Sequence, residues 1–291
     1  MNHLLFLGMG YCGRALAERL KARGWSITGT TRNPEKAKDL EAEGIRSVLF
    51  NGGEPMADID NVLAGVTHVI ASIPPDDDGD LFLRAHNHDL ARHAGHIQWA
   101  GYLSTTGVYG DSDGEWVGED APTAPTTRAG TRRLLAEQQW QALAAQSGLP
   151  LHIFRIAGIY GPGTRNQIDQ VKQGTAKRIL KANHYVGRVH RDDIVGILEA
   201  SIAMPNPGRI YNVVDHEPSA PEEVIAFTAQ LLGIEPPPAI PFEEADPSGV
   251  ARNFFSGSKR VSNARVREEL GYSFLYPTYR EGMRSIISEA G

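Results

Sequence analysis

The sequence predicts an α/β fold built on a parallel, doubly wound sheet. Short apolar runs alternate with helical patterns through the first half of the chain, and this order of elements produces parallel strands. The 291 residues are enough to bury a substantial core. The single cysteine, Cys12, excludes an internal disulfide and fits a reducing cytoplasm.

The elements follow in order from the N-terminus. The run HLLFLG predicts a buried strand at 3–8, and a helix is expected over 12–24, where Gly24 ends it. A strand at 25–30 precedes a helix over 34–44, which has Pro34 at its start and Gly44 at its end. Further strands are predicted at 45–50, 67–72, 97–104, 149–156 and 208–215, and further helices near 80–95 and 128–147, with a last helix near 262–270.

The regular alternation stops after residue 160. We expect residues 1–163 to form one doubly wound domain, onto which later elements near 185–215 pack back. Residues 164–291 then form a smaller, irregular region, in which the proline-rich segment 234–247 lacks regular structure. The stretch 165–191 holds seven Lys or Arg residues and one acid, Asp169.

A glycine-rich loop follows the first predicted strand. The segment FLGMGYCGRAL places Gly8, Gly10 and Gly13 in a G-x-G-x-x-G pattern that opens a helix. In this context Gly8 permits a tight turn, Gly10 lets the backbone approach a pyrophosphate, and Gly13 lets the helix pack closely on the strand. The segment therefore predicts a Rossmann dinucleotide site, to which Tyr11 and Cys12 contribute backbone N–H groups. The alternative is a glycine-rich turn without a ligand.

The residues after the second strand indicate which dinucleotide binds. A site for NAD usually has an acid here, but this chain has Thr31 and Arg32 and no carboxylate at 29–33. An arginine suits a dianionic phosphate. We therefore expect the cofactor to be NADP(H), with NAD(H) as the alternative. Arg32 could also be a solvated surface residue that binds no ligand. Ser72, at the end of the 67–72 strand, completes the expected cofactor contacts.

Several segments, in order, resemble the extended short-chain dehydrogenase/reductase family, which includes sugar-nucleotide epimerases and dehydratases. They are the glycine loop and the segments YLSTTGVYGD (102–111), PTTRAGTRRLLAE (125–137), FRIAGIYGPG (154–163), VHRDDIVGILEAS (189–201), IYNVVD (210–215) and SKRVSNARVREELGYSFLYPTYREGM (258–283). The resemblance covers nearly the whole chain and implies a Rossmann fold with a smaller C-terminal substrate-binding region. It says less about the reaction, because one fold hosts many chemistries.

The resemblance also implies positions for the catalytic residues. Thr105 lies where the family has the Ser or Thr that hydrogen-bonds the substrate oxygen. The family's catalytic Tyr and Lys align with Ala129 and Arg133, so the usual acid/base is missing and the chain resembles atypical members of the group. Arg133 keeps a fixed cation, and Tyr109 is the candidate replacement proton donor, unless its ring only packs under the loop.

Substrate contacts are expected from the second half of the chain. Tyr160 lies where the family lines the nicotinamide end of the cleft, although a structural role is the simpler reading. The cations of 165–191 suit an anionic substrate, or form a solvated helix face without function. Arg188, in this stretch, and Arg252, beyond it, are the individual candidates for substrate contacts.

Two functions remain open from the sequence. The first is an NADP(H)-dependent oxidoreductase or epimerase-like enzyme that acts on a carbonyl or secondary alcohol of a small substrate, possibly anionic or sugar-derived. The second is a non-catalytic NADP(H)-binding redox sensor, which the loss of both the Tyr and the Lys favours.

Composition limits the other partners. A net charge of −6 argues against nucleic acid, and no apolar run reaches the roughly 20 residues of a membrane span. We expect a cytoplasmic protein. No metal is expected, because the histidines at 86, 88, 93 and 96 lack cysteine or clustered carboxylate partners. The resemblance implies a homodimer formed through a four-helix bundle, with candidate contacts from Leu90, Leu134, Leu135, Trp140 and Leu143.

Overall fold

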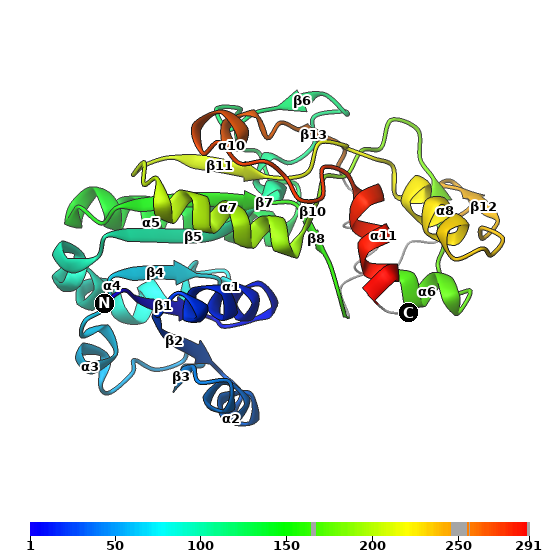
Figure 1. Cartoon of the computed structure of the whole chain (residues 1–291). Coiled ribbons are helices and arrows are strands. Elements are labelled where there is room, and N and C mark those ends of the chain that lie inside the picture. The colour runs from blue at the N-terminus through cyan, green and yellow to red at the C-terminus, as the bar shows by residue number, and fades with distance from the viewer. Residues whose placement is uncertain (164–166, 246–254, 256, 290–291) are drawn as a thin grey trace. The chain divides into compact units, whose positions relative to one another are not determined.

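The computed structural model describes residues 1–163, 167–245, 255 and 257–289 (Figure 1). The chain divides into two compact units. Unit 1 consists of Met1–Thr105, Thr131–Arg155 and Leu198–Tyr211, and unit 2 consists of Thr106–Gly130, Ile156–Ile197 and Asn212–Gly291.

A seven-stranded sheet, most of which lies in unit 1, has the order β11-β7-β5-β4-β1-β2-β3. Its strands are β1 (His3–Leu7), β2 (Ser26–Thr31), β3 (Arg46–Leu49), β4 (His68–Ala71), β5 (Trp99–Thr105), β7 (Leu151–Ile156) and β11 (Ile210–Val213). β1 pairs in parallel with both β2 and β4, so that Leu5 lies opposite Thr28 on one side and Val69 on the other. The predicted α/β class, parallel sheet and strands are confirmed. The strand order reverses beside β1, and ligands of such sheets bind at the carboxyl ends of the strands at this point.

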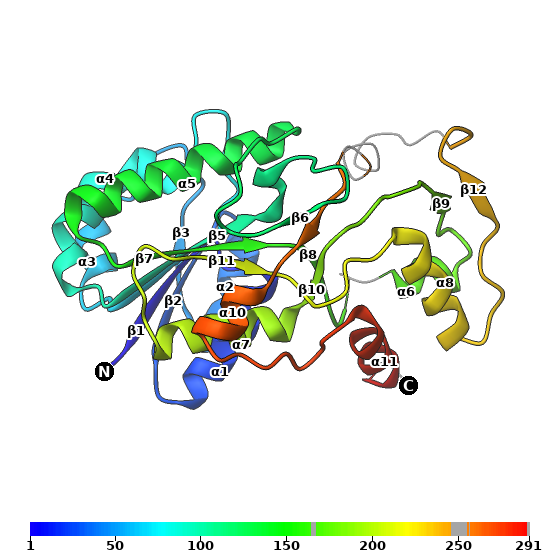
Figure 2. The ribbon, with the colours of Figure 1, turned by 90° about the horizontal axis from the view of Figure 1, so that it is seen from above.

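Helices cover both faces of the sheet in unit 1. They are α1 (Tyr11–Ala22), α2 (Pro34–Ala42), α3 (Ile59–Leu63), α4 (Leu81–His93), the short η1 (Ala94–His96) and α5 (Arg128–Ser147), whose first residues belong to unit 2. Figure 2 shows α4 and α5 on one face and α1 on the other. Asn33 begins α2 by accepting from the amide of Glu35 at 2.8 Å, and the buried Asp80 begins α4 by accepting from Phe82 and Leu83. Such side-chain caps explain where these helices begin.

The core of unit 1 lies between the sheet and the helices α3, α4 and α5. Leu90, Trp140 and Leu143 belong to it and are at most 7% exposed. The expectation that these three side chains contact a second copy is therefore wrong, because they pack against their own sheet. Leu134 and Leu135 are half-buried. Dimerisation itself stays a prediction.

A row of aromatic rings crosses the sheet on the face of α1. The imidazole of His68 lies 4.5 Å from the ring of Trp25 and 6.5 Å from that of Trp99. The ring of His152 stacks on the other side of Trp99 at 5.4 Å. The indole of Trp99 donates to Ser201 Oγ at 3.1 Å. Burial lowers the pKa of both His68 and His152 to about 4, so this row is uncharged at neutral pH.

Unit 2 is built from short elements. Its strands pair as three separate two-stranded sheets, each parallel: β6 (Trp116–Val117) with β13 (Arg260–Val261), β8 (Gly158–Tyr160) with β10 (Arg188–His190), and β9 (Arg178–Leu180) with β12 (Ala239–Pro241). The helical elements are η2 (Thr106–Tyr109), α6 (Ile168–Lys172), the first part of α7 (Arg191–Ala203), α8 (Pro221–Leu231), α10 (Ala264–Glu269) and α11 (Tyr279–Glu289).

Two expectations about this region are wrong. The proline-rich segment 234–247 contains β12, because Ala239–Pro241 pairs with β9 more than 50 residues away. A further helix, α11, follows the one predicted near 262–270. It forms because Tyr279, Met283 and Ile286 recur at helical spacing and pack with Val224 and Tyr160 in the core of unit 2.

Candidate functional site

A pocket of about 360 Å³ lies in unit 1 at the carboxyl ends of β1–β4. It is bordered by the glycine loop, the ends of β2 and β3, the segment after β4 and the start of α4. Its lining residues are Gly8, Met9, Thr30, Thr31, Arg32, Asn33, Lys36, Phe50, Asn51, Ile73, Pro74 and Leu81. This is the place where open α/β sheets bind their ligands.

The glycine loop has the geometry that the pattern predicts. Gly8 has a φ of +84°, and a Cβ there would lie 2.9 Å from Ile73 Cγ1. A Cβ on Gly13 would lie 2.8 Å from Met9 Sδ and 2.9 Å from the ring of Phe6, so the helix packs directly on the strand. At Gly10 the nearest atom is 3.8 Å away, which leaves room for a ligand against the backbone. These positions fit a bound pyrophosphate.

The helix α1 begins directly after this loop. Gly10 is its N-cap residue, and Tyr11 and Cys12 are its first two residues. Amides in the first turn of a helix point toward its N-terminus, where the helix dipole favours an anion. The thiol of Cys12 is buried. Cofactor contacts by these residues stay predictions.

Two cations border the far end of the pocket. Arg32 and Lys36, at the end of β2 and in the first turns of α2, are exposed, and Thr31 lies beside them. None of the described residues that line this pocket carries a carboxylate. Guanidinium and ammonium groups fit a phosphate on the adenosine ribose. Sequence reasoning selected Arg32 but missed Lys36, although its position one helical turn beyond was the available signal.

Sequence reasoning also missed the lining residues that follow β3 and begin α4. Phe50 and Asn51 follow β3, and Leu81 begins α4. The sequence holds no motif for them, since only the order of the strands places β3 beside β2. Ser72, in contrast, follows β4, and its amide donates to Leu7 O at 2.9 Å. It is half-buried and does not line the pocket described above.

Thr105 and Arg133 both lie in unit 1, at the end of β5 and on α5. Thr105 is half-buried. Nη1 of Arg133 donates to Leu103 O at 2.9 Å and to the Tyr102 hydroxyl at 3.4 Å, and the guanidinium lies over the Tyr102 ring. The rest of this guanidinium makes no hydrogen bond with the part of the chain that the structure describes. Arg133 is therefore anchored to β5 with donors to spare.

A buried hydrogen-bond network holds Ser104, the last residue of β5 but one. Ser104, which precedes Thr105, donates to Glu137 Oε1. Arg155 donates to the same carboxylate from Nη2 at 2.9 Å. Glu137 is 1% and Arg155 4% exposed. This network fixes the end of β5 and the helix turn that follows Arg133.

The structure places the other two predicted catalytic positions in unit 2. Ala129 is exposed near the start of α5 and supplies no titratable group. Tyr109 is 4% exposed, and its hydroxyl donates to Asn212 Oδ1 at 2.7 Å. That bond occupies the phenolic hydrogen, so the contact explains a structural role directly. A role as proton donor stays a prediction.

The predicted substrate residues have different surroundings. Tyr160 is 5% exposed in the core of unit 2, and its hydroxyl donates to Thr278 O at 3.4 Å. Nη1 of Arg188 donates to Val186 O and to the hydroxyl and carbonyl of Ser219. Arg252 lies outside the described residues. Contact with substrate stays a prediction for all three.

Positive charge gathers in unit 2 around His184. Burial, followed by the charges of Lys181, Arg188 and Lys259, lowers the pKa of its imidazole to about 4. The ammonium of Lys259 donates to Gly110 O at 2.6 Å, and burial lowers the pKa of this lysine as well. Only Lys181 and Arg188 lie in the basic stretch that the sequence indicated. Lys181 and Arg188 come from one segment, and Lys259 follows more than 70 residues later. The carboxylate of Asp111 acts on His184 in the opposite sense to these three cations.

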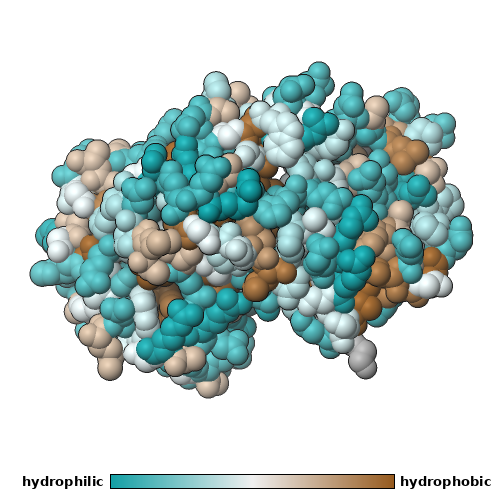
Figure 3. Space-filling view, turned by 45° about the horizontal axis from the view of Figure 1, so that its top comes forward, coloured by the Kyte–Doolittle hydropathy of each residue, from teal (hydrophilic) through white to brown (hydrophobic). Residues whose placement is uncertain are grey.

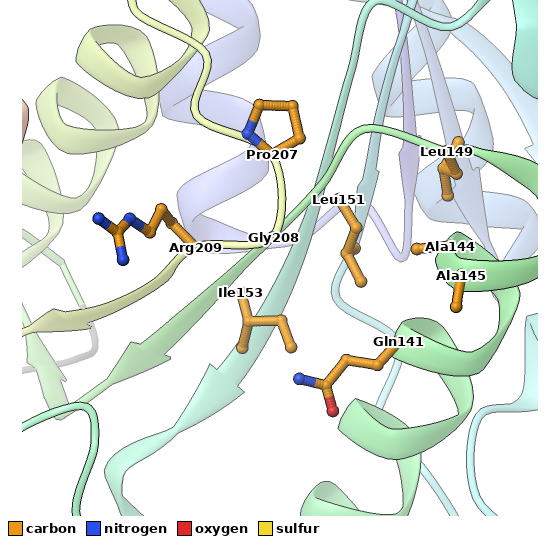
Figure 4. A pocket seen from close by; sticks show the side chains of 9 residues that line it. All are labelled: Gln141, Ala144, Ala145, Leu149, Leu151, Ile153, Pro207, Gly208 and Arg209. Carbon is orange, nitrogen blue, oxygen red and sulfur yellow. The ribbon is translucent and has the colours of Figure 1, made fainter.

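A second pocket in unit 1, of about 350 Å³, does not share these features. It lies between α5 and the start of β7, and Figure 4 shows the Arg209 guanidinium pointing away from Leu151 and Ile153. Leu151 is the first residue of its strand, so the pocket is at the amino ends of the strands. Dinucleotides bind at the opposite, carboxyl edge.

Surface hydropathy, helix length and the grouping of possible metal ligands give three further findings. On the face shown in Figure 3, hydrophilic residues predominate and hydrophobic residues form separate patches. Among the described residues, no helix has the length and apolar character needed to cross a bilayer. The same residues contain no group of three or more His, Cys, Asp or Glu side chains placed to hold a metal ion.

Family models match most of the sheet-forming sequence. Residues 3–96 match the NAD binding domain of 6-phosphogluconate dehydrogenase, and residues 84–213 match the NAD dependent epimerase/dehydratase family. The chain thus resembles NAD-dependent epimerases and dehydratases, the group that the sequence indicated. The alignment of Ala129 and Arg133 with the catalytic Tyr and Lys of that group stays a prediction. The epimerases and dehydratases of this family are NAD-dependent enzymes, and the predicted recognition is confirmed.

Two relatives match nearly the whole chain. Protein YeeZ from Escherichia coli (strain K12) is 29% identical over 287 residues, which cover 95% of this chain and 97% of that protein. The structure of a functionally unknown conserved protein from Silicibacter pomeroyi DSS is 45% identical and matches with a TM-score of 0.92 over 99% of both chains.

More distant solved structures share the fold. MoeE5 in complex with UDP-glucose and NAD matches with a TM-score of 0.79 and 20% identity, covering 100% of this chain and 98% of that one. UDP-glucuronic acid 4-epimerase from Bacillus cereus, in complex with UDP-glucuronic acid and NAD, matches with a TM-score of 0.76 and 16% identity over 99% of this chain and 100% of that one. The fold is thus that of NAD-dependent epimerases and dehydratases.

Proposed function

We propose that the chain is an NADP(H)-dependent oxidoreductase or epimerase-like enzyme, in which unit 1 binds the dinucleotide and unit 2 binds the substrate. One observation carries the cofactor assignment: the pocket beside the glycine loop ends in Arg32 and Lys36, and no carboxylate lines it. A carboxylate there would bind the ribose hydroxyls of NAD and repel a 2′-phosphate. The two cations instead support NADP(H).

The residues of unit 1 have separate parts in the proposed mechanism. When bound, the nicotinamide supplies or accepts the hydride. The hydroxyl of Thr105 donates to the substrate oxygen and polarises it. Arg133, anchored to Leu103 O, holds a positive charge and offers its remaining donors to ribose or substrate oxygens. We propose water as the proton source, because Tyr109 already donates to Asn212, and Tyr109 is the alternative.

The substrate is proposed to carry an anionic group. In unit 2 the charges of Lys181, Arg188 and Lys259 act on the buried His184, and they outnumber the one acid, Asp111, that acts against them there. MoeE5 and the Bacillus cereus epimerase are described with UDP-sugars, so sugar nucleotides belong in the first substrate panel. Phosphorylated and carboxylated carbonyl compounds complete it.

Calorimetry followed by a turnover assay tests this proposal. NADPH should bind more tightly than NADH, and NADPH should be oxidised with a member of the panel. Thr105→Val should abolish turnover and leave NADPH affinity unchanged, whereas Thr105→Ser, which keeps the hydroxyl, should retain turnover. Absence of binding heat for both dinucleotides would falsify the proposal.

A second candidate function is a redox sensor that binds NADP(H) without turnover. The position of the family's catalytic Tyr holds Ala129, and the neighbouring cation is arginine, which does not release its proton. Tight binding of NADPH, no turnover across the panel and a change in protease sensitivity between NADPH and NADP⁺ would support the sensor over the enzyme.

A further inference from the structure

Helix α4 is interrupted at a buried histidine. His86 has a φ of −139° and a ψ of 21°, outside helical geometry, and its side chain is 1% exposed. Nε2 accepts a hydrogen bond from the backbone amide of Met56 at 2.8 Å, and Nδ1 lies 2.8 Å from Asp89 Oδ2. Because Nε2 accepts from an N–H group, the ring proton is on Nδ1, which donates it to Asp89.

The amide bound by His86 belongs to the segment that follows β3. This segment begins with Phe50 and Asn51, two lining residues of the pocket beside the glycine loop. Among the described residues, the Met56–His86 bond is the only hydrogen bond that joins residues 51–57 to a helix. The amide of Gly53 is satisfied locally, by Asn51 Oδ1 at 2.9 Å.

Packing adds to this single hydrogen bond. The His86 ring lies 5.9 Å from that of Phe50 and 5.3 Å from that of Phe82, and the two phenylalanine rings meet edge to face at 6.0 Å. Gly52 has a φ of +81°, and a Cβ there would lie 2.1 Å from Leu81 Cδ2. The segment therefore lies directly on the first turns of α4, with His86 at the centre of the contact.

We infer that His86 positions residues 50–56 as the adenine-side wall of the dinucleotide pocket, although it does not line the pocket itself. This inference rests on the proposed NADP(H) site. The cations proposed to bind the phosphate, Arg32 and Lys36, lie directly after β2 and on α2. The adenine then lies beyond the ribose, toward the end of β3. Loss of His86 should therefore affect the adenosine half of the cofactor and spare the nicotinamide half.

Calorimetry with half-molecules tests this role. The probes are adenosine 2′,5′-bisphosphate and nicotinamide mononucleotide, and the variants are His86→Phe, which lacks the acceptor, and His86→Gln, which keeps one. His86→Phe should bind the bisphosphate about threefold to tenfold more weakly, as expected for one lost hydrogen bond. His86→Gln and the exposed control His88→Gln should stay within about twofold of the wild type, and mononucleotide affinity should not change in any variant.

Hydrogen exchange on the wild type supplies a readout that needs no variant. Bound bisphosphate should slow exchange at the Met56 amide, and the mononucleotide should not. Three outcomes would overturn this inference and leave the proposed function standing. They are unchanged bisphosphate affinity in His86→Phe, equal loss of affinity for both probes in that variant, and an exchange rate at the Met56 amide that does not change when the bisphosphate binds. A wild type that binds neither probe nor NADPH overturns the proposed function and this inference with it.

Discussion

Arg155 and Glu137 form an ion pair in the interior of unit 1. Nη2 of Arg155 lies 2.9 Å from Glu137 Oε2, and Nε lies 3.2 and 3.3 Å from the two carboxylate oxygens. Both residues are buried, Arg155 with 4% and Glu137 with 1% of its surface exposed. Ser104 donates to the same carboxylate, so every charge in the network has a partner.

Removal of one partner should be costly. Arg155→Met leaves the Glu137 carboxylate buried without its cation and should lower the free energy of unfolding by about 3–5 kcal/mol. The double variant Arg155→Met/Glu137→Leu should recover most of this loss, because no charge then remains in the core. Urea unfolding measures both. The exposed pair Lys38–Glu35 is the matched control, where Lys38→Met should cost less than about 1 kcal/mol.

Arg32 should decide between the two dinucleotides. Arg32→Glu places a carboxylate at the end of β2, where it repels a 2′-phosphate and accepts from ribose hydroxyls. NADPH affinity should fall about 10-fold to 100-fold, and NADH affinity should change much less. Calorimetry with both dinucleotides gives the ratio. Arg46→Glu makes the same charge change at the start of β3 and should leave the ratio unaltered; equal losses at Arg32 would remove the assignment.

Tyr109→Phe separates a structural role from a catalytic one. The substitution removes the hydroxyl that donates to the fully buried Asn212 and should lower the free energy of unfolding by about 1–2 kcal/mol. With water as the proton source, kcat should stay within about threefold of the wild type. A fall of about 100-fold in kcat with little loss of stability would instead establish the phenol as the proton donor.

Acid should destabilise unit 1 through its buried histidines. The pKa of His68 is lowered to about 4 by burial, whereas in the unfolded chain it returns toward 6.5. Between these values the unfolded state binds the extra proton, so stability falls as the pH drops from 6.5 toward 4.

Replacing His68 separates its contribution to the pH dependence of the unfolding free energy from that of the other groups. His68→Leu should reduce the dependence of the unfolding free energy on pH in that window by up to about 1.4 kcal/mol per pH unit. Buried carboxyl groups such as Asp215, whose pKa burial raises, act in the opposite sense, so each variant is compared with its parent. An identical slope in the two proteins would show that His68 takes up its proton over the same pH range in the folded and unfolded states.

The sequence was sufficient to predict those features of the fold and of the candidate site that depend on residues close together in the chain. The alternation of strands and helices predicts the sheet, and the spacing of Gly8, Gly10 and Gly13 predicts a tight turn, an open backbone and a close helix contact. Arg32 follows from its position directly after a strand. Each of these features is set within about ten residues of chain.

The features that the sequence did not predict depend mostly on contacts between residues far apart in the chain. Phe50 and Asn51 reach the pocket only because β3 lies beside β2, and β12 forms only because it pairs with β9. The Arg155–Glu137 pair joins a strand and a helix whose alignment no local pattern shows. Helix α11 differs, because the spacing of Tyr279, Met283 and Ile286 was visible in the sequence and was overlooked.

The aromatic row across the sheet gives the protein an optical reporter of its own. The indole of Trp99 lies between the imidazoles of His68 and His152, and Trp25 lies against His68 on the far side. A neutral imidazole disturbs indole fluorescence little, whereas a charged one quenches it. Trp25 and Trp99, two of the four tryptophans of the chain, thus lie where a charged His68 or His152 would reduce their emission.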